Sequence, residues 1–264
     1  MYSVSNLTYK VGKSSILKSI NCAFSVSKFN LILGQNGSGK STLLKCLSGL
    51  LTPNEGAIYF NNDNLSALSL KNQATKRSVL LQQNICSERL KVKEVLALSV
   101  ISDKKSDGDY LQFLVDLFDI KKLIESEINQ LSGGEQQRVH FVRVLNQLGN
   151  TDLSSKVLLL DEPISAADIN YQIKFLEFVQ NQVYNSGLTA IAILHDLSLG
   201  MRYADWVIGL KQGHLIAAYS KQQTLENDVL TDIFDVDFEI LKLGNNRTVI
   251  LPKMETLNGN KQFK

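Results

Sequence analysis

Gly34-Gln35-Asn36-Gly37-Ser38-Gly39-Lys40-Ser41-Thr42 is the stretch that decides the fold, because it fits the phosphate-loop pattern G-x-x-x-x-G-K-[ST]. Residues 29–33 (FNLIL) come before it and form a short apolar run typical of a strand, and leucines recur at helical spacing after it. Glycines let several N–H groups point at one anion, and the following helix adds the positive end of its dipole. The stretch therefore predicts a strand, a phosphate-binding loop and a helix.

Three side chains at the end of this loop carry distinct expectations. Lys40 can reach β- and γ-phosphates, the Ser41 hydroxyl can ligate Mg²⁺, and Thr42 can donate to a neighbouring phosphate oxygen. A glycine-rich turn that merely joins a strand to a helix is the alternative, and the flanking strand and helix patterns disfavour it. We expect all nine residues from Gly34 to Thr42 to hold a nucleotide.

Composition bounds the class of protein. The 264 residues are 44% hydrophobic and carry a formal charge of +2, which allows a substantial core and gives no sign of a surface for nucleic acid. Cys22, Cys46 and Cys86 show no paired spacing, which favours reduced thiols. The N-terminus lacks the apolar run of a signal peptide, and no stretch approaches the ~20 apolar residues that span a bilayer. We expect a soluble protein that reaches a membrane only through a partner.

The rest of the chain reads as an α/β protein with one helical insertion. Short alternating segments in residues 1–33 and at 57–60 predict a small antiparallel sheet beside the nucleotide site. Residues 83–150 are mostly helical in pattern, with helices expected at 95–100, 110–118 and 139–148. Toward the C-terminus we expect a hairpin around Gln212-Gly213, a helix at 224–234 and a polar tail.

Two predicted core strands end at a polar side chain. Residues 79–81 stop at Gln82, which can bind the metal or the attacking water from a strand end, although an ordinary surface glutamine is the alternative. Residues 190–194 stop at His195, on the ligand side of an open α/β sheet, and we interpret it as a sensor of the γ-phosphate rather than a surface histidine. The other two histidines lack such placement and are interpreted as structural: His140 and His214.

A third strand ends in two carboxylates. The unbroken apolar run at 157–160 suits a strand buried on both faces, and Asp161 and Glu162 follow it. We expect Asp161 to hold Mg²⁺ through water and Glu162 to polarise a water against the γ-phosphorus. Asp168, in the stretch Ser165-Ala166-Ala167-Asp168, suits either a tight contact between subunits or the first turn of a helix.

The stretch Leu131-Ser132-Gly133-Gly134-Glu135-Gln136-Gln137-Arg138 opens a helix. Ser132 and Glu135 have the spacing of a capping box. Adjacent glycines in a first helical turn are costly, so capping alone does not account for Gly133 and Gly134. Bare backbone at a helix N-terminus is useful where a phosphate must approach closely, and we favour this interpretation.

Taken in order, GQNGSGKST, Gln82, LSGGEQQR, LLLDEP, SAAD and His195 give a chain that resembles the ATP-binding subunit of an ABC transporter over about residues 2–250. The resemblance implies a P-loop ATPase fold of ABC type, with a parallel core sheet, an N-terminal antiparallel β-subdomain and an inserted helical subdomain. It implies one ABC ATPase domain at 1–252, a polar tail at 253–264, and ATP hydrolysis coupled to transmembrane transport, with ATP and Mg²⁺ bound.

The resemblance also implies partners. Two copies would form a head-to-tail dimer with two ATPs, in which the loop of Lys40 in one copy faces Ser132, Gly133 and Gly134 of the other. Glu135, next to them, would also bind the nucleotide. Integral-membrane permease subunits would receive the motion through the helical subdomain and Gln82, on the cytoplasmic face of the cell membrane. A substrate-binding protein would act indirectly.

Finer features resemble the importer subclass for iron chelates, haem and vitamin B12, and the stretch RVHFVRVLNQL resembles haem importers most. A vitamin B12 importer and an exporter remain alternatives. A chromosome or DNA-repair ATPase is disfavoured, because Lys40 and Asp161 lie only 121 positions apart with no sustained heptads between them. A scaffold without hydrolysis is disfavoured because Lys40 and Glu162 are both present.

Three positions depart from the family pattern. Val11 stands before the turn glycine, where an aromatic side chain usually stacks on adenine, and Tyr9 lies two residues earlier as the remaining candidate for that contact. Ile164 stands where threonine is usual, and Ala167 where leucine is usual. Both of these changes imply softer packing at the dimer interface.

Overall fold

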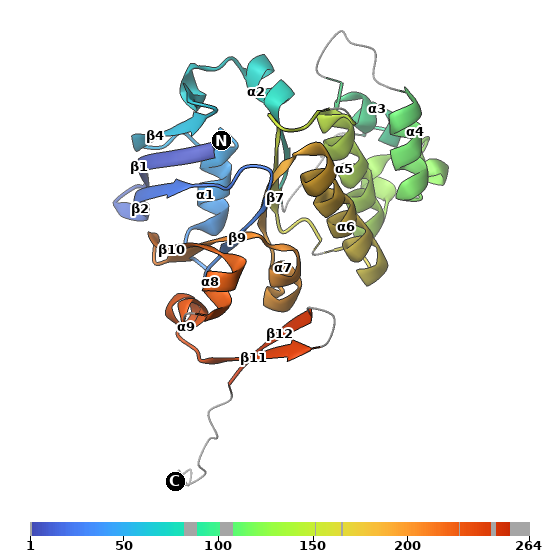
Figure 1. The fold of residues 1–264 in the computed structure, drawn as a ribbon. Helices are drawn as coiled ribbons and strands as arrows, with labels where there is room; N and C mark the ends of the chain where they lie inside the picture. Colours follow the sequence, from blue (N-terminus) through green and yellow to red (C-terminus); the bar gives the residue numbers. More distant parts are fainter. Residues whose placement is uncertain are drawn as a thin grey trace, which may run out of the picture.

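The computed structural model describes residues 2–81, 89–100, 108–150, 152–164, 166–226, 228–243 and 247–253 (Figure 1). They form two main sheets, a group of helices beside the larger sheet and a C-terminal two-stranded hairpin. The α/β fold class, with an antiparallel sheet at the N-terminus and a core sheet of parallel strands, is confirmed.

The larger sheet holds the strands that carry the predicted phosphate loop and carboxylates. Its order is β10-β9-β3-β8-β7-β6; β10 runs antiparallel to β9, and the other pairings are parallel. The bounds are β3 Phe29–Leu33, β6 Arg77–Leu80, β7 Val157–Asp161, β8 Thr189–Ile193, β9 Trp206–Lys211 and β10 His214–Ser220. Every residue of β3, β7 and β8 is buried, which explains their continuous apolar runs.

Register aligns the carboxyl ends of these strands at one edge of the sheet. Asp161, the last residue of β7, lies opposite Ile193, the last residue of β8. Leu33, the last residue of β3, lies opposite Gly209 of β9. Loops that leave β3, β7 and β8 therefore begin side by side, and these loops carry the predicted site residues.

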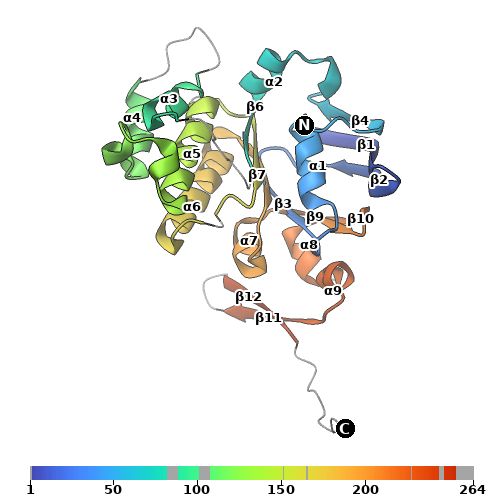
Figure 2. The same ribbon diagram turned by 180° about the vertical axis from the view of Figure 1, so that it is seen from behind.

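The smaller sheet has the order β2-β1-β4-β5 and is antiparallel throughout. Its strands are β1 Tyr2–Val11, β2 Ser14–Ala23, β4 Glu55–Phe60 and β5 Asp63–Asn64. Helix α1 (Lys40–Leu47) lies between the two sheets (Figure 2). Its Leu43, Leu44 and Leu47 share one apolar cluster with Tyr2 of the small sheet and Ile32 of the large sheet. This cluster fixes the helix that follows the phosphate loop.

A group of helices covers the β6–β7 side of the large sheet (Figure 1). It comprises α3 Val92–Ala97, α4 Gly108–Leu117, η2 Lys121–Leu123, η3 Ile128–Gln130, α5 Gly133–Leu148 and α6 Ile169–Ser186, while α2 Leu70–Lys76 and η1 Leu65–Ala67 precede β6. Phe141 of α5 stacks on Phe175 of α6 with ring centroids 4.0 Å apart. The helix expected at 95–100 instead starts at Val92, because the Glu94 carboxylate accepts from the Lys91 N–H and caps it there.

The C-terminal part differs most from the sequence expectation. The hairpin around Gln212-Gly213 is confirmed, but the single helix expected at 224–234 is wrong. Two helices stand there, α8 Lys221–Glu226 and α9 Val229–Phe234. Asp228 stands at the N-cap of α9 with non-helical backbone angles, and a short polar side chain of this kind competes with helical backbone hydrogen bonds.

An antiparallel hairpin that was not predicted, β11 Phe238–Leu243 and β12 Arg247–Pro252, follows α9. It packs on α7 (Leu197–Tyr203), where the Ser198 hydroxyl donates to the Ile250 carbonyl and accepts from the Ile250 N–H. Most of the predicted polar tail lies outside the described residues. Across the described ranges, the helices are too short or too polar to cross a membrane.

Candidate nucleotide-binding site

The phosphate loop joins β3 to α1, and its glycines are required by backbone geometry. Gly34 and Gly39 have φ of 157° and 103°, which L side chains rarely adopt. A Cβ on Gly34 would clash with the Leu210 carbonyl oxygen, and one on Gly39 would lie 2.7 Å from Leu17 Cδ2. The loop therefore keeps its shape only with glycine at these positions.

Lys40 is the first residue of α1, and its ammonium group makes hydrogen bonds back to the start of the phosphate loop. Nζ donates to the carbonyl oxygens of Gly34 (2.8 Å) and Gln35 (2.9 Å). Burial lowers the pKa of Lys40, and the carboxylates of Glu162 and Asp161 oppose this shift. The ammonium group is held by two carbonyl oxygens that a phosphate can replace.

A cavity of about 300 Å³ opens over this loop. It is lined by Ile32, Leu33, Gly34, Gln35, Asn36, Lys40, Leu194, His195, Leu197 and Phe234. Lys40 and His195, the loop lysine and the predicted sensor histidine, thus line the same cavity. Leu197 and Phe234 were not predicted from the sequence, because nothing in their local pattern marks them as part of a site.

Ser41 and Asp161 form the candidate magnesium site. The Ser41 hydroxyl donates to Asp161 Oδ1 at 3.0 Å. Burial raises the pKa of Asp161, and the hydrogen bond from Ser41 opposes this shift. A hydroxyl and a carboxylate oxygen in contact are the donor types that Mg²⁺ prefers, so the pair fits this ion. Thr42 lies partly exposed in the first turn of α1.

Glu162 and His195 meet at the edge of the sheet. Glu162 follows β7 with φ of 50°, a left-handed conformation that costs free energy for a residue with a side chain. Its N–H donates to the Ile193 carbonyl at 3.1 Å, which holds it beside β8. Its Oε1 lies 2.7 Å from His195 Nε2. The Glu162 side chain is only 10% exposed and that of His195 is 62% exposed, so the pair joins the interior to the cavity mouth.

The helix that carries the paired glycines begins elsewhere. Ser132 caps α5: its N–H and hydroxyl donate to Glu135 Oε2 at 2.9 and 2.8 Å. The predicted capping box is present, and Gly133 is exposed at the helix start. Among the residues that line the Lys40 cavity, none comes from Ser132, Gly133, Gly134 or Glu135. Within one chain the two predicted halves of the site are separate.

Five further positions that the sequence singled out lie away from these contacts or outside the described residues. Asp168 occupies the N-cap position of α6, but its exposed side chain makes no capping hydrogen bond. The helix-start interpretation therefore explains where the backbone of Asp168 lies and does not explain its carboxylate. Tyr9 is partly buried against the apolar cluster of the small sheet, and Val11 is 59% exposed. Gln82 and Ser165 lie outside the described residues.

Sequence reasoning did not anticipate the contacts of Gln35. Its amide donates to the Phe234 carbonyl (2.8 Å) and to Asp235 Oδ2 (3.1 Å), and Asp235 also accepts from Lys211. These bonds tie the phosphate loop to the end of α9. The sequence holds no signal for them, because the partners lie about 200 positions apart.

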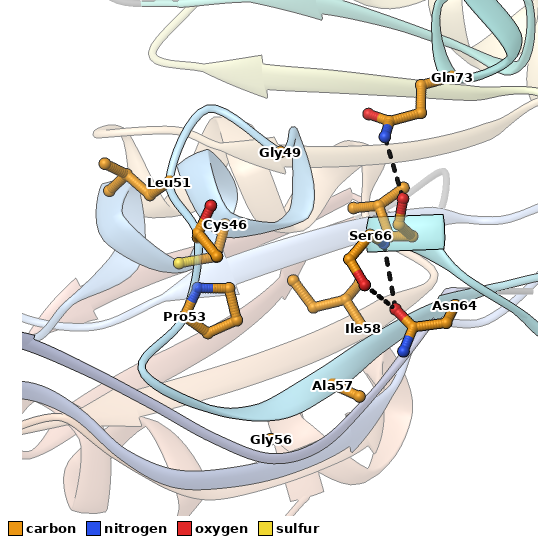
Figure 3. Close-up of a pocket in the computed structure, with 12 residues that line it drawn as sticks. Cys46, Gly49, Leu51, Pro53, Gly56, Ala57, Ile58, Asn64, Ser66 and Gln73 are labelled. Carbon is orange, nitrogen blue, oxygen red and sulfur yellow. Dashed lines mark hydrogen bonds between the residues drawn. The ribbon is translucent and has the colours of Figure 1, made fainter. Parts of the chain in front are cut away.

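A second cavity of about 300 Å³ lies at the other end of α1 (Figure 3). Cys46, Pro53 and Ile58 give it apolar walls, and Asn64 and Gln73 add polar groups. The Gln73 amide is satisfied by the Leu65 and Leu68 carbonyls, and burial raises the pKa of Cys46 to about 12. The cavity therefore offers no reactive or unsatisfied group from these two residues.

A phosphate loop, an adjoining pair of carboxylates, a histidine just after the neighbouring strand and a separate glycine-led helix define the class of ATP-binding cassettes. A family model described as "ABC transporter" matches residues 17–165. The chain belongs to the ABC transporter family, as one of its ATP-binding subunits.

Curated relatives match nearly the whole chain. "Hemin import ATP-binding protein HmuV" of Rhodopseudomonas palustris (strain BisB5) is 32% identical over 249 residues, covering 94% of this chain and 95% of the relative. The protein of the same name from Escherichia coli O157:H7 is 34% identical over 253 residues, covering 95% and 98%.

Solved structures share the fold. An ATP-binding subunit of an ABC transporter has a TM-score of 0.74 at 22% identity, over 88% of this chain and 92% of that one. A dimeric bacterial ABC transporter cassette has a TM-score of 0.72 at 25% identity, over 84% of this chain and 99% of that one. A related dimer, bound to ADP and Pi after hydrolysis, has a TM-score of 0.71 at 24% identity over the same shares.

Proposed function

We propose that this chain is the ATP-hydrolysing subunit of an importer for haem or a related iron chelate and works through a separate membrane permease. The observation that carries the hydrolytic role is the 2.7 Å contact between Glu162 and His195 at the mouth of the cavity that also contains Lys40. Support for the cargo comes from the relatives named as hemin import ATP-binding proteins, which align with nearly the entire chain.

The residues of the site suggest the following division of labour. The N–H groups of residues 34–42 and the Lys40 ammonium group would hold the phosphates. Glu162 would accept a proton from the attacking water while the bond from the γ-phosphorus to its bridging oxygen breaks, which yields ADP and phosphate. His195, hydrogen-bonded to Glu162, would orient that carboxylate and contact the γ-phosphate. Ser41 and Asp161 would hold Mg²⁺, which would neutralise charge on the phosphates.

Two copies of the chain would complete each site. The start of α5 is exposed and lies apart from the Lys40 cavity, so a second copy is the natural source of Ser132, Gly133 and Gly134 beside each ATP. Asp168, whose exposed side chain makes no capping hydrogen bond, would contact the same partner. Tyr9 would face the adenine. A related cassette that was solved as a dimer supports this pairing.

The remaining parts would connect the site to transport. We assign residues 1–252 to one ABC ATPase domain, with the helices from α3 to α5 and Gln82 as the link to integral-membrane permease subunits. The subunit would sit at the cytoplasmic face of the cell membrane, and a substrate-binding protein would deliver cargo to the permease. The residues from 253 on would form a polar tail.

Reconstitution tests both levels of the proposal. The subunit is assembled with its permease in lipid nanodiscs, and ATP turnover is measured with the binding protein and haem, a ferric siderophore or cobalamin. We expect haem or the siderophore to stimulate turnover several-fold over the cargo-free rate. Stimulation by cobalamin alone would refute the iron-chelate assignment. Lys40→Ala is the inactive control, and turnover that survives in it would refute the nucleotide site itself.

A further inference from the structure

The side chain of Gln137 uses both ends of its amide on one short segment of chain. It projects from α5, four residues after the glycine that starts this helix. Its Nε2 donates to the Pro163 carbonyl, and its Oε1 accepts from the Ala166 N–H at 2.9 Å. Gln137 is partly buried. A single amide therefore spans the segment that begins directly after Glu162.

The same segment packs closely on the glycines at the start of α5. A Cβ on Gly134 would lie 3.2 Å from the Ala166 carbonyl oxygen, tighter than an ordinary contact, and a Cβ on Gly133 would lie 3.7 Å from Ala166 Cβ. The start of α5 thus rests on this segment, and Gln137 fastens the two together. A displacement of the start of α5 therefore moves this segment as well, because both hydrogen bonds of the Gln137 side chain would otherwise break.

A second glutamine, on a different helix, also holds this segment. Gln172 of α6 donates to the Ile164 carbonyl at 3.0 Å and to the Ala167 carbonyl at 2.8 Å. Both bonds tie the segment to α6 rather than to α5. Two glutamines therefore hold one piece of backbone, and of the two it is Gln137 that links it by hydrogen bonds to the helix that carries the glycines.

We propose that Gln137 is a positioning residue that couples the two ATP sites of the dimer. This inference rests on the proposed function, in which the start of α5 contacts the ATP bound by the partner subunit. Closure of α5 on that ATP pulls on the Pro163–Ala166 segment through the Gln137 amide. The pull sets the position of Glu162 at the chain's own ATP, so each site reports its occupancy to the other.

The chemistry of the bridge makes substitutions informative. Alanine removes both bonds. Glutamate keeps an acceptor for the Ala166 N–H but has no donor for the Pro163 carbonyl, so it breaks one end only. Gln172→Ala is the matched control, because it removes two bonds to the same segment without cutting the connection to α5.

The test uses the full transporter in nanodiscs and measures turnover against ATP concentration. We expect wild type and Gln172→Ala to show a Hill coefficient near the two-site limit of about 2, and Gln137→Ala to fall to about 1. Maximal turnover of Gln137→Ala should drop about tenfold, because misplacement of a reacting group is costly, while ATP affinity of the isolated subunit stays within about twofold of wild type. Gln137→Glu should fall between the two.

Two outcomes overturn the inference separately from the proposed function. If wild type hydrolyses ATP cooperatively and Gln137→Ala keeps the same Hill coefficient, Gln137 does not couple the sites. An equal loss in Gln172→Ala would show that only the stability of the segment matters. If wild type neither dimerises with ATP nor hydrolyses it, the proposed function fails, and the coupling role fails with it.

Discussion

At the scale of single residues, Glu162 has a strained backbone conformation at a position where we expect the catalytic base. Its left-handed backbone costs of the order of 1 kcal/mol, and the N–H bond to Ile193 and the contact with His195 hold it there. A residue kept in a costly conformation at the edge of a sheet is typical of active sites. The geometry therefore holds the Glu162 carboxylate against His195, a residue that lines the Lys40 cavity.

Glu162→Gln should keep ATP binding and lose hydrolysis. The amide has nearly the same shape but does not accept the proton, so we expect turnover to fall by about 10²–10⁴-fold. Binding is measured with a fluorescent ATP analogue, and the association state by analytical ultracentrifugation. ATP-loaded Glu162→Gln should accumulate as a dimer. Turnover at the wild-type rate would show that another group acts as the base.

Ser41→Ala should change the dependence on Mg²⁺. The variant removes the hydroxyl that contacts Asp161 at 3.0 Å, so one oxygen donor of the ion is lost. We expect the Mg²⁺ concentration for half-maximal turnover to rise about tenfold, in line with the loss of about one ligand interaction. Ser48→Ala, at the other end of the same helix region, is the control. An unchanged Mg²⁺ titration would place the metal elsewhere.

At the scale of helices and strands, the sequence was informative where one local rule dominates. β3, β7 and β8 are buried throughout, so their apolar runs were enough to find them. α5 begins where the Ser132 and Glu135 capping box places it. The split between α8 and α9 and the β11–β12 hairpin were missed. Contacts with distant segments stabilise that hairpin, such as Ser198 with Ile250, and short sequence patterns do not contain them.

His140 of α5 should make the protein less stable in acid. Both ring nitrogens are buried without a hydrogen-bond partner, and burial, aided by Arg143, lowers the pKa to about 4. The unfolded chain takes up a proton near pH 6.5, whereas the folded chain does not until about pH 4, so stability falls as the pH drops between these values. This residue should cost about 2 kcal/mol at pH 5 relative to pH 7.

Urea unfolding at pH 7 and pH 5 measures this effect. His140→Leu should lose less stability between the two pH values than wild type does, by about 2 kcal/mol, because leucine has no proton to take up. His214→Gln, at an exposed position, should retain the wild-type difference. Equal acid sensitivity in His140→Leu and wild type would mean that other groups account for it.

At the scale of the whole molecule, the chain presents two incomplete half-sites. The Lys40 cavity has the phosphate loop, Glu162 and His195 beside it, and the start of α5 is exposed and lines no part of that cavity. The sequence motifs alone predicted which residues belong to each half-site, because each motif carries its own local chemistry. Their separation within one chain was expected only from the family resemblance. The contacts of Gln35 and Gln137 were not predicted, because a glutamine pattern does not reveal its distant partners.

Two copies that share ATP should bring Asn36 of one chain close to Gly133 of the other. Both positions are exposed, and a Cβ on Gly133 meets nothing closer than Ala166 Cβ at 3.7 Å, so cysteine is tolerated there. In a background without Cys22, Cys46 and Cys86, chains carrying Asn36→Cys are mixed with chains carrying Gly133→Cys and treated with a short bismaleimide.

We expect a cross-linked band of doubled mass with ATP, strongest when both chains also carry Glu162→Gln, and none without nucleotide. The control pair replaces Gly133→Cys with Gln112→Cys, which is exposed on α4 and belongs to neither half-site. Because the shared-ATP arrangement demands that the two half-sites meet only when nucleotide fills the space between them, a cross-link that forms equally without ATP, or never forms, contradicts it. A band with the Gln112 pair would show random collision rather than a defined dimer.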